Sequence, residues 1–380
     1  MKANKKDRKE AISEIKFSPD DSILAVGAHD SLIKLYDATK NFALLRTIRK
    51  NLSTVSHFDF SLDGQFLVSN STSYEILYFD VATGNQITGG ASQLRNETWS
   101  TYTCHLGWAV QGIWPPCADG SDINAVDRSS EGVVTATADD FGMVKLFKHP
   151  SPVERAAFHE YRGHSSHVTN VRFLKNSPYL ISTGGEDKCI FQWRYYFDRE
   201  SAEASKKESL VDISNIADDL GTAKPAASPL KTQKTVKKAG EDEFEMEEVG
   251  GGDQRMAVLP FKGQVEKSKP TGFKPLPKAA DKPDGNMKLL YAHGFRSFDT
   301  RNNLKYVTKD DVVFSTAALG VVLNKPTNTQ KFFNMHPEDI VSLAIHPSKD
   351  IIATGQMAQA GRSKQIDIFV WRVSTMQMLA

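Results

Sequence analysis

The sequence predicts an all-β chain built from β-propeller blades, and three observations support this fold class. Short runs of alternating apolar and polar residues, typical of strands that bury one face, recur through residues 1–198. Turn-forming residues separate these runs, as in Ser18-Pro-Asp-Asp and Ser61-Leu-Asp-Gly. Each unit also closes on an aromatic residue, and Tyr36, Phe79, Phe147 and Trp193 are 43, 68 and 46 residues apart. A generic antiparallel domain would show the alternation but not a period in the forties, which is typical of blades.

Four such units are expected in order along the first part of the chain, each with three strands and an aromatic end. Their expected strands cover residues 12–17, 23–27 and 32–37; 55–60, 66–69 and 75–80; 123–126, 133–137 and 143–147; and 168–173, 180–183 and 189–193. The long interval before the third unit holds an insertion, residues 98–116, that contains Trp99, Trp108 and Trp114. We interpret this tryptophan cluster as packing inside an inserted blade, in preference to a ligand cage.

The fourth unit carries the most specific pattern. Gly163-His164 precedes its first strand, Asp187 lies in the turn before its last strand, and Thr183 lies ten residues before Trp193. An imidazole that is half-buried needs a partner on each nitrogen, and an indole N–H needs an acceptor. This pattern resembles the WD-repeat family, in which a His, a Ser or Thr, an Asp and a Trp form a structural hydrogen-bond network within one blade. In the first unit Asp30 keeps the turn position, but Val26 replaces the hydroxyl.

The composition changes twice along the chain and predicts three regions. Residues 1–198 hold the four blades, residues 199–285 form a charged linker, and residues 286–380 hold about two further blades. The linker contains the acidic run 241–248 and the basic stretch 231–238, and it has too few apolar residues to offset the cost of ordering its backbone. We therefore expect it to be mostly disordered. Within it, residues 203–220 and the acidic run are candidate short helices, and residues 256–261 are a candidate anchored segment.

The start of the last region has a pattern that resembles a known family. The motif residues are Tyr291, Gly294, Phe295, Arg296, Asp299, Arg301, Asn303 and Leu304. They are similar to the hydrophobic motif that opens the pair of propellers in echinoderm microtubule-associated protein-like proteins. Residues 312–356 resemble the first blade of that family, and residues 108–115 and 139–150 resemble its closing blades.

The order of these pieces predicts a junction between two tandem modules, because the closing blades come before the opening motif. A complete module of the family needs about a dozen blades, whereas four blades and then about two are expected here. An incomplete ring leaves strand edges unpaired. We therefore expect either a fragment or truncated gene model, or pieces that need a neighbouring chain. The aromatic motif residues, Tyr291, Phe295, Phe298 and Tyr306, are expected to be buried and to seat the two propellers of the module against each other, in preference to contacting a partner.

Composition excludes several classes of function. Lys and Arg total 47 and Asp and Glu total 46, so the net charge of +1 argues against binding nucleic acid by bulk charge. No apolar run approaches the length of a membrane span, and the N-terminus has no apolar signal region. The three cysteines, Cys104, Cys117 and Cys189, form no C-x-x-C pair, which favours a reduced, intracellular compartment.

No group of residues indicates catalysis, a cofactor or a metal. His159, His164 and His167 are close in sequence, but no cysteine lies at ligand spacing, so a structural role is favoured over zinc. Asp139 and Asp140 are expected to hydrogen-bond backbone in a blade turn, and not to act as paired acid and base. Gly250-Gly-Gly252 lacks the following Lys-Ser/Thr of a phosphate loop, and Cys189 is expected in the core.

The family resemblance implies a non-catalytic scaffold in the cytoplasm that binds tubulin or microtubules and associates with the cytoskeleton. Because the tubulin surface is acidic, the basic stretch 231–238 and the N-terminal Lys5-Lys6-Asp-Arg8-Lys9 are candidates for steering such a partner, against the simpler interpretation of a solvated linker. The alternative function is a general WD-repeat adaptor for another protein complex, such as a signalling or ciliary assembly. An enzyme is disfavoured.

Overall fold

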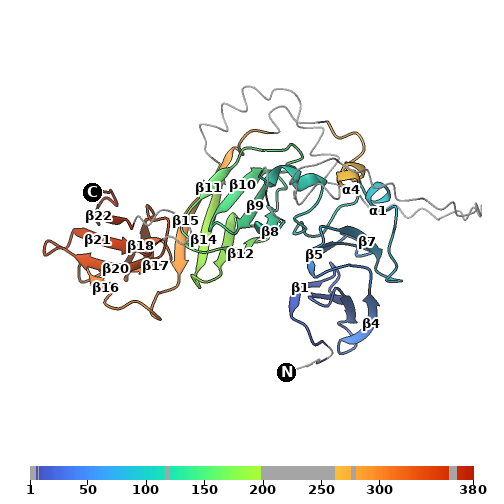
Figure 1. The fold of residues 1–380 in the computed structure, drawn as a ribbon, viewed down its shortest axis with the longest axis horizontal. Helices are drawn as coiled ribbons and strands as arrows, with labels where there is room; N and C mark the ends of the chain where they lie inside the picture. The colour runs from blue at the N-terminus through green and yellow to red at the C-terminus, as the bar shows by residue number, and fades with distance from the viewer. Residues whose placement is uncertain are drawn as a thin grey trace, which may run out of the picture. The chain divides into compact units, whose positions relative to one another are not determined.

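The structure is a computed structural model that describes residue 6, residues 8–115, residue 118 and residues 120–197, 262–274, 280–358 and 366–380. Its described strands form six antiparallel sheets, each of which follows the chain as a meander (Figure 1). We number these sheets as blades 1–6 in chain order. The predicted all-β fold of propeller blades in two incomplete parts is confirmed.

The strands of the first three blades have the following bounds. Blade 1 contains β1 (Ile12–Phe17), β2 (Ile23–Ala28), β3 (Ile33–Asp37) and β4 (Ala43–Ile48). Blade 2 contains β5 (Val55–Phe60), β6 (Phe66–Ser71) and β7 (Ile76–Asp80). Blade 3 contains β8 (Ile123–Arg128), β9 (Val134–Asp139), β10 (Val144–Lys148) and β11 (His159–Tyr161). Between blades 2 and 3 lie the short helix α1 (Gly90–Gln93) and a 3₁₀ segment, Trp108–Ile113.

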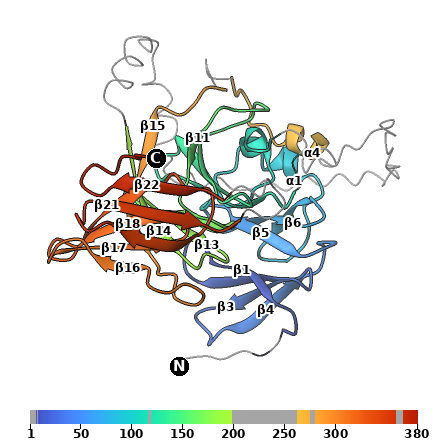
Figure 2. The ribbon, with the colours of Figure 1, turned by 60° about the vertical axis from the view of Figure 1, so that its left-hand side comes forward.

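The other three blades extend to the end of the chain. Blade 4 contains β12 (Val168–Phe173), β13 (Tyr179–Gly184), β14 (Ile190–Phe197) and β15 (Gly285–His293). Blade 5 contains β16 (Leu304–Tyr306), β17 (Asp311–Thr316), β18 (Leu319–Asn324) and β19 (Thr329–Phe333). Blade 6 contains β20 (Ile340–Ile345), β21 (Ile351–Gln356) and β22 (Ile368–Arg372). Figure 2 brings blades 5 and 6 to the front.

The first strand of five blades carries an irregularity at the same place. In β1, β5, β8, β12 and β20 the register with the second strand shifts between the first and third residues. Such a bulge adds one residue to one strand and increases its local twist. A bulge repeated at one position in five strands shows that these sheets are copies of one structural unit.

A buried polar cluster connects the first strands of blades 1, 2 and 4. Nδ1 of His57 lies 2.8 Å from Oε2 of Glu14, and Nζ of Lys16 lies 3.0 Å from Oδ1 of Asp59. Nη2 of Arg172 lies 4.0 Å from Oε1 of Glu14. Burial alone would raise the pKa of Asp59, but the charge of Lys16 and several hydrogen bonds lower it to about 2. The carboxylate is therefore ionised in the native state, and its pairing with Lys16 holds blade 1 against blade 2.

The fourth strand of blade 4 comes from beyond the predicted linker. β14 ends at Phe197, and its neighbour in the sheet is β15, which begins at Gly285 (Figure 1). The region predicted to begin at residue 286 as a separate part therefore starts inside blade 4. The physical reason is that β14 would otherwise present an unpaired edge, which β15 covers.

Part of the predicted linker is ordered against blade 3 and the insertion before it. Val265, in the helix α4 (Lys262–Lys267), is buried in the same core as Trp114, and the ring of Phe273 lies 4.5 Å from that of Trp108. The linker boundary at residue 285 is therefore wrong at its C-terminal end, because two apolar side chains after residue 261, those of Val265 and Phe273, join this core. Residues 198–261, which include the candidate helices, the anchored segment and both charged stretches, lie outside the described residues.

The core follows the chain from blade to blade. One buried cluster joins blades 1 and 2, a second joins blade 2 to the insertion and blade 3, and a third joins blades 3 and 4 and continues into β17 and β18 of blade 5. Blades 5 and 6 have a core of their own around Phe333 and Trp371, whose rings stack at 4.9 Å. Among the described residues, no helix has the length and apolar character to cross a membrane.

Candidate interaction site

The histidine network of blade 4 is assembled at the start of β12. Nδ1 of His164 lies 2.7 Å from Oδ2 of Asp187, and its Nε2 lies 2.8 Å from Oγ of Ser182. The indole N–H of Trp193 donates to the same hydroxyl at 2.8 Å. Oδ1 of Asp187 also accepts the backbone N–H of Cys189 at 3.0 Å. Every polar atom of the two buried rings has a partner, as a low-dielectric interior requires.

The structure corrects one member of this network. Thr183 was expected to supply the hydroxyl, but its Oγ1 lies 2.9 Å from that of Thr169, away from His164. Because side chains alternate along a strand, a shift of one residue moves the hydroxyl to the other face of the sheet. Ser182 is the residue that faces the ring.

Blade 6 holds a second copy of the network, which the sequence analysis missed. Nε2 of His336 lies 2.7 Å from Oγ1 of Thr354, and its Nδ1 lies 2.9 Å from Oε1 of Gln356. The indole N–H of Trp371 donates to Thr354 at 3.2 Å. Burial lowers the pKa of His336, so its ring is neutral near neutral pH.

A constant spacing would have revealed these contacts. In blades 4 and 6 the histidine and its hydroxyl partner are 18 residues apart. The same spacing of 18 links Asn51 to Ser69 in blade 2, where the side chains are 2.9 Å apart. In blade 1 it links the Arg8 guanidinium to the carbonyl of Val26 at 2.7 Å, so an arginine replaces the histidine where the hydroxyl is lost.

The motif at the start of the last region is organised around one buried arginine. Nε and Nη2 of Arg296 donate to the carboxylate of Asp299 at 2.8 and 2.6 Å, and Nη1 forms an ion pair with Asp339, just before blade 6. Its carbonyl accepts the amide of Asn303 at 2.7 Å. Burial would lower the pKa of Arg296, but the hydrogen bonds to the two carboxylates raise it. Ser165, next to His164, also donates to Asp339.

Gly294 allows this motif to lie against blade 4. Its φ is +147°, in the region that favours glycine, and an added Cβ would lie 2.7 Å from Sγ of Cys189 and 3.0 Å from Oγ1 of Thr316. The thiol and hydroxyl of these two residues are themselves 2.9 Å apart. The motif therefore connects the end of blade 4 to blades 5 and 6 through the contacts of Gly294 and Arg296.

The expected burial of the motif's aromatic residues is largely wrong. Phe295, Phe298 and Tyr306 are exposed, as are Arg301 and Leu304, and Tyr291 is half-buried. The reason is that Arg296, not the aromatic rings, occupies the space between blade 4 and blade 6. Cations cover two of the exposed rings: Lys188 lies 4.2 Å from the Phe298 centroid, and Lys325 lies 4.5 Å from that of Tyr306.

Comparison with known proteins identifies the family. Residues 1–195 match the family profile described as echinoderm microtubule-associated protein second beta-propeller, and residues 282–321 match the HELP motif. The first match covers just over half of the 380 residues. The chain belongs to the echinoderm microtubule-associated protein-like family. The two matches follow each other in the order that the sequence predicted, with the second propeller before the opening motif.

Relatives in this family align over about half of the chain. Echinoderm microtubule-associated protein-like 2 of Rattus norvegicus is 48% identical over 191 residues, which cover 50% of this chain and 29% of that protein. Echinoderm microtubule-associated protein-like 4 of Xenopus laevis is 42% identical over 212 residues, which cover 55% of this chain and 22% of that protein. The chain thus spans less than a third of the length of these relatives.

A solved structure, the Cps50 (Swd1) beta-propeller domain of Myceliophteria thermophila, aligns over 96% of this chain and 98% of its own, with 11% identity and a TM-score of 0.41. That agreement is too low to carry an argument. The assignment of blades rests on the sheets and their repeated bulge.

The side chains considered for catalysis have structural partners in this member of the family. His159 binds the carbonyl of Pro283 at 2.9 Å, and His167 lies 3.0 Å from Oγ of Ser166, so the three clustered histidines point to different partners. Asp139 accepts the backbone N–H of Phe141 at 3.0 Å, as a turn residue does. Among the described residues no group of three or more His, Cys, Asp or Glu side chains is placed to hold a metal ion.

Cys189 is buried, and its surroundings make it a poor nucleophile. Burial raises the pKa of its thiol to about 12, so it is a neutral thiol at physiological pH. The tryptophans of the insertion are also part of the core: Trp108 and Trp114 are buried, and the indole N–H of Trp114 donates to the carbonyl of His105 at 3.0 Å. These contacts account for the cluster by packing.

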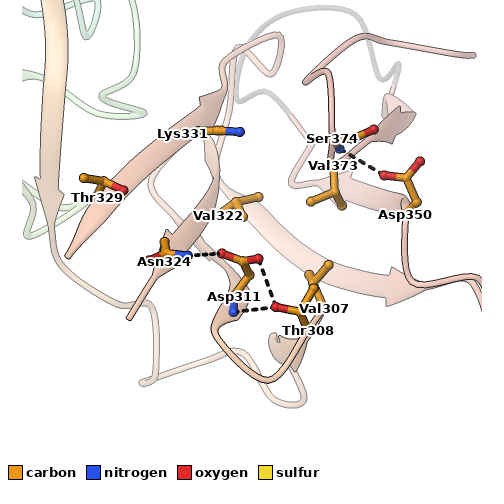
Figure 3. Close-up of a pocket in the computed structure, with 10 residues that line it drawn as sticks. All are labelled: Val307, Thr308, Asp311, Val322, Asn324, Thr329, Lys331, Asp350, Val373 and Ser374. Atoms are coloured by element: carbon orange, nitrogen blue, oxygen red, sulfur yellow. Dashed lines mark hydrogen bonds between the residues drawn. The ribbon is translucent and has the colours of Figure 1, made fainter. Parts of the chain in front are cut away.

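A pocket of about 210 Å³ lies between blades 5 and 6 (Figure 3). Its two carboxylates already have partners: Asp311 accepts from Asn324 at 2.8 Å and from Thr308 at 2.9 Å, and Asp350 accepts the backbone N–H of Ser374 at 3.0 Å. These bonds fix the two carboxylates in the pocket wall. We assign no reaction to it.

Proposed function

We propose that this chain is a non-catalytic scaffold that binds tubulin or microtubules through the surfaces of its blades. The observation that carries the proposal is its membership of a family whose relatives are named microtubule-associated proteins. The structural roles of Cys189 and of the clustered histidines support a scaffold in preference to an enzyme. A cytoplasmic, microtubule-associated location is part of the same proposal.

The basic stretch 231–238 is the favoured electrostatic element. It contains four lysines at positions 231, 234, 237 and 238. The N-terminal basic cluster is weaker as a candidate, because Arg8 is already bonded to Asp30 and to the carbonyl of Val26 within blade 1. A basic segment attracts an acidic partner over a distance set by the salt concentration, about 10 Å at 0.1 M.

The test is microtubule co-sedimentation of the full chain over a series of salt concentrations. We expect the chain to pellet with microtubules at low salt and less at high salt. Replacing the four lysines of 231–238 by glutamate should weaken binding at low salt. The matched control replaces four acidic residues of the run 241–248 by glutamine, which changes the net charge in the opposite direction and should not weaken binding.

The alternative is a WD-repeat adaptor for a protein complex without tubulin. The exposed Phe295, Phe298 and Tyr306 favour it, because exposed aromatic residues are typical of protein interfaces. Absence of co-pelleting at low salt, together with absence of binding to soluble tubulin, would refute the first proposal and leave the adaptor.

A further inference from the structure

The pocket between blades 5 and 6 lies where blade 5 departs from the other blades. The strand registers align Asp311, the first residue of β17, with the first residue of the second strand in each of the other five blades. That residue is apolar or aromatic in all five, namely Ile23, Phe66, Val134, Tyr179 and Ile351. Val134, for example, is buried in the core that joins blade 3 to blade 4. Blade 5 therefore has a carboxylate where the other blades place an apolar or aromatic side chain.

The carboxylate of Asp311 is held by neutral groups. It accepts the side-chain amide of Asn324 at 2.8 Å and the hydroxyl of Thr308 at 2.9 Å (Figure 3). Asn324 occupies the strand position of Asp37 in blade 1 and Asp80 in blade 2, and like them it accepts the backbone N–H of a threonine in the turn that follows. An amide at this position keeps that turn and also donates to Asp311, which a second carboxylate would repel.

The pocket has an apolar floor and a polar rim. We call its buried valines, Val307, Val322 and Val373, the floor, and the exposed Thr329 and Ser374, which each carry a hydroxyl, belong to the rim. The volume of about 210 Å³ is smaller than the roughly 300–1,000 Å³ of pockets that hold drug-sized ligands. The pocket is therefore of a size for one side chain of a partner protein.

The other charged side chains of the pocket leave Asp311 without a cation. Lys331 is opposite Val322 in the pair of β18 and β19, and Figure 3 shows Val322 between Lys331 and Asp311. Among the described residues Lys331 forms no ion pair with Asp311, whose partners there are uncharged. Asp350 is already paired with Arg372 at 2.7 Å. Asp311 is thus the carboxylate of the pocket whose charge remains to be balanced by a ligand.

We propose that this pocket binds an arginine side chain of a partner protein. The aliphatic part of the arginine packs on the three valines of the floor, and its guanidinium donates to the carboxylate of Asp311. Arginine is favoured over lysine because its planar group carries five N–H donors, which can serve the carboxylate and the hydroxyls of the rim together. An acidic side chain is disfavoured because it would face the like charge of Asp311. The proposal does not depend on microtubule binding.

The test is an NMR titration of the full chain, with isotope-labelled valine methyl groups, by a capped glycine–arginine–glycine peptide. We expect the methyl signals of Val307, Val322 and Val373 to shift and to saturate as the peptide is added. The same peptide with citrulline, which has nearly the shape of arginine without its charge, should bind about tenfold more weakly, because it lacks the charge-assisted hydrogen bond to Asp311. A lysine peptide should bind more weakly than the arginine peptide.

Four variants locate the binding at Asp311. Asp311→Asn should weaken binding of the arginine peptide by about tenfold, and Asp311→Ile, which introduces the residue of blade 1, should abolish it. Asp310→Asn is the matched control, because it makes the same change of charge at the neighbouring residue, which does not line the pocket, and it should leave binding nearly unchanged. Lys331→Gln removes a like charge from the pocket and should strengthen binding.

The absence of saturable shifts at the three valines, or equal affinity for the arginine and citrulline peptides, would overturn the proposal. So would undiminished binding by Asp311→Ile. Tighter binding of a glutamate peptide that is lost in Lys331→Gln would assign the pocket to an acidic partner, and would overturn it too. Valine signals outside the pocket report whether each variant keeps its fold. The comparison of arginine with citrulline uses the unmodified chain, so it decides the question without any variant.

Discussion

The histidine networks of blades 4 and 6 share one geometry but differ in one partner. In both, a histidine nitrogen and an indole N–H meet on the same hydroxyl, and the side chains involved are buried. In blade 4 the other nitrogen faces the carboxylate of Asp187, and in blade 6 it faces the amide of Gln356. The difference teaches that blades 4 and 6 share the ring, hydroxyl and indole, while the second acceptor can be either a carboxylate or an amide.

Removing the histidine should therefore cost more in blade 4 than in blade 6. His164→Ala leaves the carboxylate of Asp187 buried without its ring partner, and a broken buried pair costs about 3–5 kcal/mol. His336→Ala leaves only neutral groups unpaired, at about 1–3 kcal/mol. The measurement is the free energy of unfolding in urea, with His164→Ala combined with Asp187→Asn as the matched control. Equal losses for both histidines, or no recovery in the double variant, would contradict the comparison.

The next largest expected effect concerns the two neighbouring hydroxyls of β13, those of Ser182 and Thr183. Ser182→Ala leaves Nε2 of His164 and the indole N–H of Trp193 without a partner, so we expect a loss of about 1–3 kcal/mol. Thr183→Ala, the neighbouring control, loses only a partly exposed contact with Thr169 and should change stability by less than about 0.5 kcal/mol. Denaturant titration separates the two. A larger loss for Thr183→Ala would show that the register of β13 is wrong.

Gly294→Ala tests the junction that the two networks flank. Its backbone conformation disfavours a side chain, and its Cβ would meet Sγ of Cys189, so we expect a loss of about 1–3 kcal/mol. Gly272→Ala is the matched control, because that glycine also has a positive φ, +74°, but its Cβ would meet nothing within 4 Å. Thermal melts of both variants compare strain alone with strain plus a clash. Similar melting shifts would place the motif away from blade 4.

The smallest effect is a change of pH dependence in blade 6. Burial lowers the pKa of His336 below its ordinary value of 6.5. The unfolded chain then binds a proton that the native ring does not, so this stability is present above that value and is lost as the pH falls below it. Gln356→Glu places a carboxylate beside Nδ1 of His336 and should raise the pKa of this ring. Each unit of that rise corresponds to about 1.4 kcal/mol of differential interaction between the charged and neutral ring. Titration of His336 by NMR measures it, and an unchanged or lower pKa would contradict the assigned contact.

Periodicity and strand alternation predicted the fold, because both are local properties of the sequence. Six blades in two parts followed from the aromatic spacing and from the family motif. The hydroxyl of the network was misassigned by one residue, because a turn spacing does not fix which face of β13 a side chain occupies. The second network escaped notice because its acceptor is Gln356, not an aspartate, and a longer segment between β21 and β22 moves Trp371 farther along the chain.

The burial of the HELP motif and the completion of blade 4 could not be predicted in the same way. The exposure of Phe295, Phe298 and Tyr306 depends on Arg296 finding Asp339, some forty residues later, and no local pattern encodes that pairing. Likewise, β15 begins at Gly285 and pairs with β14, which ends at Phe197, so the two strands are far apart in the sequence. Long-range pairing of this kind is set by which strand edge remains uncovered.

The two parts of the chain are joined where β15 completes blade 4. Hydrogen–deuterium exchange followed by mass spectrometry tests it most directly on the unmodified chain. We expect the amides of Gly285–His293 that face β14 to exchange as slowly as those of β13 and β14. Exchange of Gly285–His293 at the rate of an unstructured peptide, while β13 stays protected, would contradict it.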